Sequence, residues 1–286
     1  MRTMKLHPQA KQRLAFALLS LSTIFVVLPV LAVIYLLLSR GLPAINWTFL
    51  TQPPVNMMRE GGIFPAIVGT IYLIIGTTLF ALPLGLLAAI YLSEYAKPGP
   101  FTRLIRLSIV NLAGVPSVVY GLFGLGLFVM LLHFGASLLS GSLTLAILTL
   151  PVIITASEEA LSSVPQSFRD ASLALGATKW QTTMGVVLPN AVSGIITGLI
   201  LGIGRAAGET APILFTVAAF YLRDLPHSMY DQAMALPYHL YVLSTQVPNA
   251  PPKIQWGTAL VLLVLVLGMN LMAAIIRTRF RRARKW

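Results

Sequence analysis

Long runs of apolar residues limit what this chain can fold into. Of its 286 residues, 57% are hydrophobic and only 10% are charged, whereas a soluble domain carries about a quarter charged residues. A helix that spans a bilayer needs about 20 mostly apolar residues. Six runs of roughly that size occur, at 14–38, 63–92, 107–133, 141–157, 186–220 and 257–276. We therefore expect an all-α, polytopic membrane protein with six transmembrane helices.

Several of these runs carry a further expectation. The first is too long for a signal-peptide core and lacks a small-x-small cleavage site, so it should be retained. The fourth is short, and the fifth is long enough to kink at Pro212. In the third, Gly114, Pro116 and Gly121 allow two interpretations. They could mark a kink that neighbouring helices stabilise, or a broken helix that exposes backbone to a substrate.

The placement of the basic residues predicts the orientation of the chain. The net charge is +12, and most Lys and Arg lie before the first run, in alternate loops and in the tail after the last run. The other loops hold only Arg40, Arg59, Arg223 and Lys253. By the positive-inside rule, both termini lie in the cytoplasm. The basic tail then fits an anchor at anionic membrane lipid, and no nucleic-acid partner is expected.

The sequence offers little for catalysis. It contains no Gly-Lys pair and therefore no phosphate-binding loop, so we expect that the chain does not hydrolyse ATP itself. It has no cysteine, and its four histidines show no metal-ligand spacing, so no metal site is expected. An enzyme of lipid metabolism is an alternative for which the eight carboxylates suggest no reactive group.

A polar segment, residues 158–185, lies between the fourth and fifth runs. Ser167 to Asp170 fits a capping box that opens a helix through Leu175, and Gly176 is suited to end it. Thr178 to Gln181 fits a second capping box, opening a helix that enters the fifth run. The loop is therefore expected to hold two short helices at an angle.

The first of these helices has an apolar stripe. Phe168, Ala171 and Leu175 recur at helical spacing. Such a stripe suits a helix that lies in the groove of a partner protein. It also suits a helix that lies flat at the membrane interface, and periodicity alone leaves both hypotheses open.

Arg205 and Glu209 interrupt the fifth apolar run. A charge at the bilayer centre costs about 3 kcal/mol on insertion scales, so such residues normally face protein or a watery cavity. On an ideal helix both fall on the face formed by Gly194, Gly198 and Gly202, which allows close packing of a neighbouring helix. One hypothesis is a structural ion pair. The other is that Arg205 meets a permeating oxyanion, while Glu209 keeps that anion from binding too tightly.

A spacing pattern that runs from the polar segment 158–185 into the fifth run distinguishes this chain. Asp170-Ala171-Ser172 is followed after three residues by Gly176 and after nine more by Val186-Val187-Leu188-Pro189. The pattern resembles the EAA loop of ABC-importer permeases, with Asp for Glu, Ser for Ala and Val for Ile. The resemblance implies a type I ABC importer permease fold and favours a partner groove for the first loop helix. It also implies that an ATPase subunit is coupled through Asp170, Ala171, Gly176, Trp180, Leu188 and Pro189. Segment 158–185 is therefore called the coupling loop below.

Three further segments are similar to the phosphate-importer branch of that family. They are Glu60–Ile63, Leu112–Gly121 and Gly204–Pro212, the last in the form typical of the A-type permease subunit. The resemblance covers about residues 60–280 and implies a substrate pathway that includes Arg205, Glu209 and Thr210. It implies no cofactor in this chain, since ATP and Mg are used by the ATPase. It also implies the bacterial inner membrane as the location.

The partners implied are a second, homologous permease subunit, two ATPase subunits and an extracytoplasmic phosphate-binding protein. The outer loop 221–256 could form a gate or dock the binding protein, while its tyrosines could equally form an interfacial belt. A gradient-driven secondary anion transporter or channel is the alternative function. It would explain Arg205 and Glu209 but not the spacing from 170 to 189.

The chain is expected to divide into three parts. Residues 1–62 form the N-terminal cytoplasmic segment, the first transmembrane helix and an outer loop. Residues 63–277 form the permease domain, and residues 278–286 form the basic cytoplasmic tail.

Overall fold

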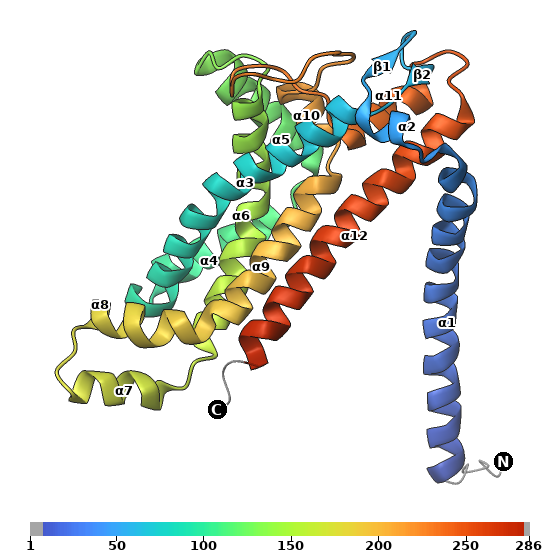
Figure 1. Cartoon of the computed structure of the whole chain (residues 1–286). Helices are drawn as coiled ribbons and strands as arrows, with labels where there is room; N and C mark the ends of the chain where they lie inside the picture. Colours follow the sequence, from blue (N-terminus) through green and yellow to red (C-terminus); the bar gives the residue numbers. More distant parts are fainter. Residues whose placement is uncertain (1–7, 283–286) are drawn as a thin grey trace.

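The computed structural model describes residues 8–282 and is a bundle of long, tilted helices (Figure 1). The long helices are α1 (Pro8–Gly41), α3 (Phe64–Ile90), α6 (Leu138–Ser162), α9 (Leu188–Gly208) and α12 (Pro252–Arg282). The shorter elements are α2 (Trp47–Thr51), β1 (Pro54–Val55), β2 (Glu60–Gly61), α4 (Pro100–Ala113), α5 (Ser117–Gly124), α7 (Gln166–Ala174), α8 (Lys179–Thr182), α10 (Ala211–Thr216) and α11 (Leu236–Thr245).

Five of the six apolar runs contain a continuous helix long enough to span a membrane, and one run is broken. Within residues 8–282, five helices are long and apolar enough to cross a membrane, and α4 with the helix from Ser117 to Leu131 forms a pair bent by 102°. The chain leaves the helix at Pro116, which has a ψ of 139°. Tyr120 Oη donates a hydrogen bond to the carbonyl of Leu112 at 2.7 Å, so a carbonyl at the end of α4 keeps a partner. The third run is therefore a broken helix and not a mild kink.

The expectation of a kink at Pro212 is wrong. The fifth helix ends at Gly208, and Glu209 has extended backbone with φ −73° and ψ 135°. A separate helix, α10, then begins at Ala211 and carries Pro212 in its first turn. Proline is well suited to that position because its missing N–H would have no helical partner there.

Helix α6 is the centre of the bundle, with α3 and α9 packed along it. Small residues allow these helices to approach closely. Gly76 of α3 lies against Ser142, and Gly198 of α9 lies against Ala156. The glycine face predicted for the fifth run is therefore the face that packs on α6.

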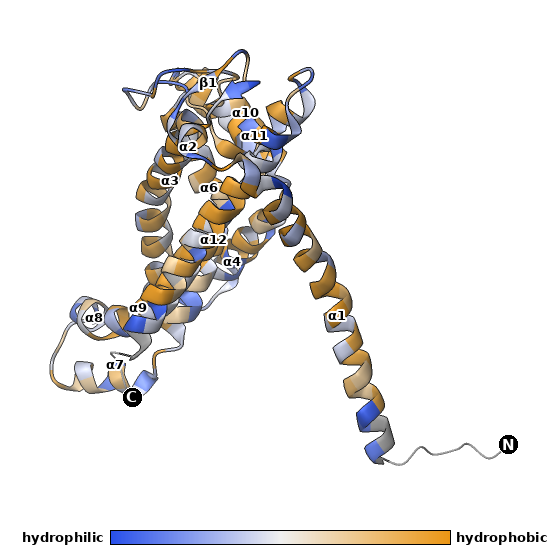
Figure 2. Ribbon diagram, turned by 45° about the vertical axis from the view of Figure 1, so that its right-hand side comes forward, coloured by the Kyte–Doolittle hydropathy of each residue, from blue (hydrophilic) through white to orange (hydrophobic). Residues whose placement is uncertain are grey.

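Helix α1 is separate from the rest. Its apolar stretch has no buried residues, and only its outer end meets α12 (Figure 1). There Gly41 lies close to Leu260, and the guanidinium of Arg40 lies 5.2 Å from the ring centre of Trp256. Figure 2 shows that most residues along α1 are hydrophobic, so this exposed helix requires lipid or another protein to cover it.

The two ends of the bundle differ. The described ends of α1 and α12 nearest the two termini lie toward the same end as α7 and α8, while α2, α10, α11 and the β1–β2 hairpin cap the opposite end (Figure 1). This arrangement agrees with both termini being on the cytoplasmic side. Part of the outer loop covers the start of α6, since the amide of Leu138 donates to the carbonyl of Asp231 at 2.9 Å. The division of the chain at residues 62 and 277 stays a prediction.

Candidate coupling loop and substrate pathway

The first helix of the coupling loop begins earlier than its sequence predicts. Helix α7 starts at Gln166, directly after Pro165, and no side chain caps it. The capping box expected from Ser167 to Asp170 is therefore wrong. Pro165 already has the extended backbone of an N-cap, with φ −58° and ψ 139°, so Ser167 lies inside the helix.

The turn and the second loop helix are as expected. Gly176 has a φ of +84°, a conformation that L side chains rarely adopt, and it follows the end of α7. Thr178 and Gln181 form the predicted capping box, with the Thr178 amide donating to Gln181 Oε1 at 2.8 Å and the Gln181 amide donating to Thr178 Oγ1 at 3.3 Å. The helix then continues through a π-helical turn, Thr183–Val187, into α9.

The coupling loop carries exposed apolar side chains on the surface that faces away from the bundle. Leu175 is 90% exposed, and Phe168, Leu173 and Trp180 are also exposed. Ala171 and Asp170 are exposed beside them, and Asp170 accepts a hydrogen bond from Gln166 Nε2 at 3.0 Å. Apolar groups gathered on a polar cytoplasmic loop indicate a protein-binding surface. Leu173 was missing from the predicted stripe.

Leu188 and Pro189 have a different setting from the other predicted coupling residues. Both are partly buried at the start of α9. Leu188 packs against the buried cluster that includes Leu161 and Val187. The structure therefore places these two residues at the base of the coupling loop, away from its exposed surface.

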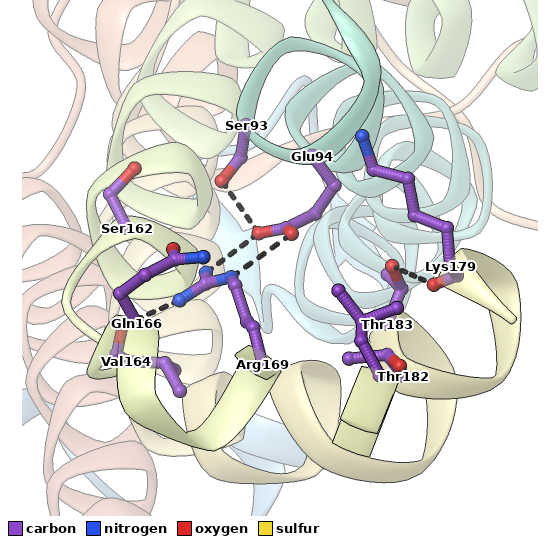
Figure 3. A pocket seen from close by; sticks show the side chains of 10 residues that line it. Ser93, Glu94, Ser162, Val164, Gln166, Arg169, Lys179, Thr182 and Thr183 are labelled. Atoms are coloured by element: carbon purple, nitrogen blue, oxygen red, sulfur yellow. Dashed lines mark hydrogen bonds and ion pairs between the residues drawn. The ribbon is translucent and has the colours of Figure 1, made fainter. Parts of the chain in front are cut away.

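The sequence analysis missed an ion pair between the coupling loop and α3. Arg169 of α7 contacts Glu94, which lies in a π-helical turn, Tyr91–Tyr95, at the inner end of α3 (Figure 3). The nearest N–O distance is 2.7 Å, and the two side chains are only 13% and 7% exposed. We call it the inner ion pair. The only sequence signals were a carboxylate just after the second apolar run and an arginine just before Asp170.

A cavity of about 550 Å³ lies beside the inner ion pair. Its walls come from the inner ends of α3 and α6 and from both loop helices, as Figure 3 shows. Polar groups such as Ser93, Thr183 and Lys179 line it. Polar contacts around this open space therefore add to the attachment that the loop already has through α9 and the buried cluster at its base.

Arg205 and Glu209 do pair, but across the end of a helix. Arg205 Nε and Glu209 Oε1 are 3.4 Å apart, and the side chains are 33% and 16% exposed. Glu209 has left the helix, so the contact depends on extended backbone at that residue. We call it the outer ion pair. Within residues 8–282 the Arg205 guanidinium donates to a single protein acceptor, Glu209.

Two neighbours complete this region. Thr210 follows Glu209 at the start of α10, and its hydroxyl does not cap that helix. Helix α10 packs on α5, next to the break between α4 and α5 that Tyr120 bridges. The predicted pathway residues therefore gather where two helices are interrupted. In the described part of the chain, no three His, Asp or Glu side chains could hold a metal ion together.

One continuous helical segment connects the two groups of predicted residues. It runs from Lys179 to Gly208 without a break. Trp180 lies near its inner end and Arg205 near its outer end. At 1.5 Å per residue, the two are separated by roughly 37 Å along the helix.

Comparison with known proteins places the chain in a transport family. Residues 81–285 match the family described as binding-protein-dependent transport system inner membrane component. The phosphate transport system permease protein PstA of Mycobacterium leprae is 35% identical over 282 residues, covering 97% of this chain and 92% of that protein. The protein of the same name in Haemophilus influenzae is 31% identical over 240 residues, covering 84% of each chain.

Solved structures agree on the fold. A bacterial ABC transporter for alginate, in complex with a pentasaccharide-bound periplasmic protein, has a TM-score of 0.69 at 16% identity and covers 94% of this chain and 95% of its own. The MetNI methionine ABC transporter in an inward-facing conformation has a TM-score of 0.62 at 18% identity, covering 76% of this chain and 97% of its own.

Proposed function

This chain belongs to the family of binding-protein-dependent transport system inner membrane components, and on that basis we propose that it is a permease subunit of an ATP-driven importer of inorganic phosphate. It is a multi-pass inner-membrane protein with the type I ABC importer permease fold. The phosphate assignment draws on relatives named as phosphate transport permeases and on the Gly204–Pro212 segment.

The observation that carries the proposal is the unbroken helix from Lys179 to Gly208. Its inner end bears an exposed apolar loop suited to a protein partner, and its outer end bears a cation in an apolar span. A force applied to the loop is therefore transmitted along one continuous helical segment to the residues beside the pathway. A gradient-driven transporter would leave this exposed loop and the spacing from 170 to 189 unexplained.

The proposed partners follow from what the chain leaves uncovered. Two ATPase subunits, which use ATP and Mg, bind the coupling loops of this chain and of a second, homologous permease. Asp170, Ala171, Gly176 and Trp180 lie on or beside the exposed loop surface. Arg205 is one-third exposed within an apolar span, so a second permease is needed to complete the pathway around it. An extracytoplasmic binding protein delivers phosphate to the outer end.

Arg205 is the proposed phosphate contact. A guanidinium offers several donors in a plane, and tetrahedral oxyanions accept them well. Glu209 holds one edge of the guanidinium between transport events and competes with the anion, which keeps the bound state short-lived. Thr210 is positioned beside them at the start of α10.

Labelled-phosphate uptake into proteoliposomes tests the function. The vesicles hold this chain with its co-purified partners and the binding protein. ATP is added or withheld on the side of the membrane that carries the ATPase subunits. Sulfate and molybdate serve as competitors. We expect uptake that requires ATP and is insensitive to either competitor. ATP-dependent import of a different oxyanion would overturn the substrate, and uptake driven by an ion gradient without ATP would overturn the mechanism.

A further inference from the structure

The inner ion pair connects the coupling loop to α3 through both oxygens of the Glu94 carboxylate. Arg169 Nε donates to one oxygen of Glu94 at 3.1 Å, and Nη2 donates to the other at 2.7 Å. A bidentate arginine–carboxylate contact fixes both distance and orientation. Helix α7 packs mainly on α8 and on the turn Thr183–Val187, so its connection to α3 depends strongly on this side chain.

The same guanidinium also holds the end of α6. It donates to the carbonyl of Val164 at 2.6 Å and to that of Leu161 at 2.9 Å. These carbonyls lie at and just after the end of the helix, where helical partners are missing. One side chain therefore fixes α7 relative to two transmembrane helices.

A second contact joins the other loop helix to the same turn of α3. Lys179 Nζ of α8 lies 5.1 Å from the ring centre of Tyr95, on the far side of the cavity from Arg169 (Figure 3). The hydroxyls of Ser172 and Thr182 are 2.9 Å apart, which joins α7 to α8. The π-helical turn Tyr91–Tyr95 is thus held by both loop helices, and such turns occur frequently at functional sites.

We infer that the bidentate contact between Arg169 and Glu94 is the link that carries movement of the coupling loop to α3. The inference rests on the proposed function, because it needs an ATPase that moves the loop. Both are positioning residues, and neither touches ATP or phosphate. Helix α3 packs along α6 and contacts α9, so displacing its inner end shifts the bundle that borders the pathway.

Two single substitutions test this link in the whole complex. Glu94→Gln keeps the shape of the side chain and removes its charge, and Arg169→Lys keeps the charge and removes the planar fork. The readout is the number of ATP molecules hydrolysed per phosphate imported in proteoliposomes. We expect ATPase binding and hydrolysis to persist while uptake falls, so that the ratio rises about 10-fold, within the usual range of coupling between sites.

The chain offers a matched control. Arg106 and Glu158 also form a 2.7 Å ion pair near the inner end of the bundle, which joins α4 to α6 and involves no residue of α7 or α8. Arg106 also donates to the carbonyl of Leu92 at 3.0 Å, within the turn Tyr91–Tyr95, so only the Glu158 side of this pair is independent of that turn. Glu158→Gln is therefore the control, and it should leave the ratio within about 2-fold of the wild type, as the loss of an ordinary partly exposed pair does. An equal rise in the ratio for both pairs would overturn the inference.

A covalent tether between positions 94 and 169 tests whether this contact transmits movement or only stabilises the loop. The chain has no cysteine, so Glu94→Cys with Arg169→Cys provides two unique thiols. We expect this double variant to hydrolyse ATP with little uptake, and a short bifunctional thiol reagent to restore uptake. Failure of the tethered protein to regain uptake would overturn the link.

Loss of ATPase binding in the single variants would also overturn the inference, because the pair would then only maintain the docking surface. The proposed function is tested separately by the wild-type complex. If that complex imports another anion, the ratio for that anion still tests the link.

Discussion

Two arginine–glutamate pairs, the inner and the outer ion pair, lie near opposite ends of the helical segment Lys179–Gly208, and they are built differently. In the inner ion pair, Arg169 donates to both oxygens of Glu94 and to two carbonyls, and its side chain is 13% exposed. In the outer ion pair, Arg205 makes one contact of 3.4 Å and is 33% exposed. An arginine held by four hydrogen bonds suits a contact that stays in place, whereas an arginine with unused donors can exchange its partner for an anion.

The largest effect is expected from the exposed arginine. Arg205→Gln should reduce phosphate uptake by roughly 100-fold, because hydrogen bonds to charged groups contribute about 1.5–3 kcal/mol each. ATPase binding and basal hydrolysis should persist. Arg59→Gln is the matched control, since Arg59 also has one hydrogen bond, to the carbonyl of Pro248 at 3.1 Å, but lies outside the apolar spans. If Arg205→Gln transports normally, the outer ion pair is structural.

The turn between the loop helices should give the next largest effect. Gly176→Leu forces a side chain into a backbone with φ +84°, at a cost of about 1–2 kcal/mol or a rearranged turn. Uptake should fall about 10-fold with weaker ATPase binding, measured by co-purification and by transport. Gly176→Asn is the control, because asparagine tolerates this conformation better. Equal behaviour of Leu and Asn would contradict the coupling role of the turn.

Glu209→Gln should have a smaller and distinctive effect. Without the competing carboxylate, Arg205 should hold phosphate longer, so both KM and the maximal rate should fall, each by about 3-fold. The measurement is the phosphate dependence of uptake at saturating ATP. A rise in KM would mean that Glu209 positions Arg205 for phosphate and does not compete with it.

The smallest expected difference between the two ion pairs is in thermal stability. Removing one partner of a buried pair leaves an uncompensated charge, so Glu94→Gln should lower the Tm of the purified complex by about 4 °C. Glu209→Gln should change it by less than about 1 °C, since Arg205 is one-third exposed and lines the proposed pathway. A similar decrease in Tm for both variants would contradict the distinction between a permanent inner ion pair and an exchangeable outer ion pair.

Local patterns in the sequence predicted much of the molecule correctly. The apolar runs identified the spans, and Thr178 with Gln181 identified the start of the second loop helix. These features depend on residues within a few positions of each other, so helical periodicity and capping chemistry suffice to find them. The start of α7 was misassigned because Pro165 competes with the cap expected at Ser167, and two nearby signals conflicted.

The sequence by itself determined that the chain lies in a membrane, which way it faces, and that a loop with EAA-like spacing precedes a charged span. Only the tertiary structure decided that the third span is broken, that Glu209 lies beyond the end of its helix, and that Glu94 meets Arg169. That last pair joins residues 75 positions apart. Its existence depends on how α3, α6 and α7 pack, and helix packing is set by the shape of whole surfaces, which no short window of sequence contains.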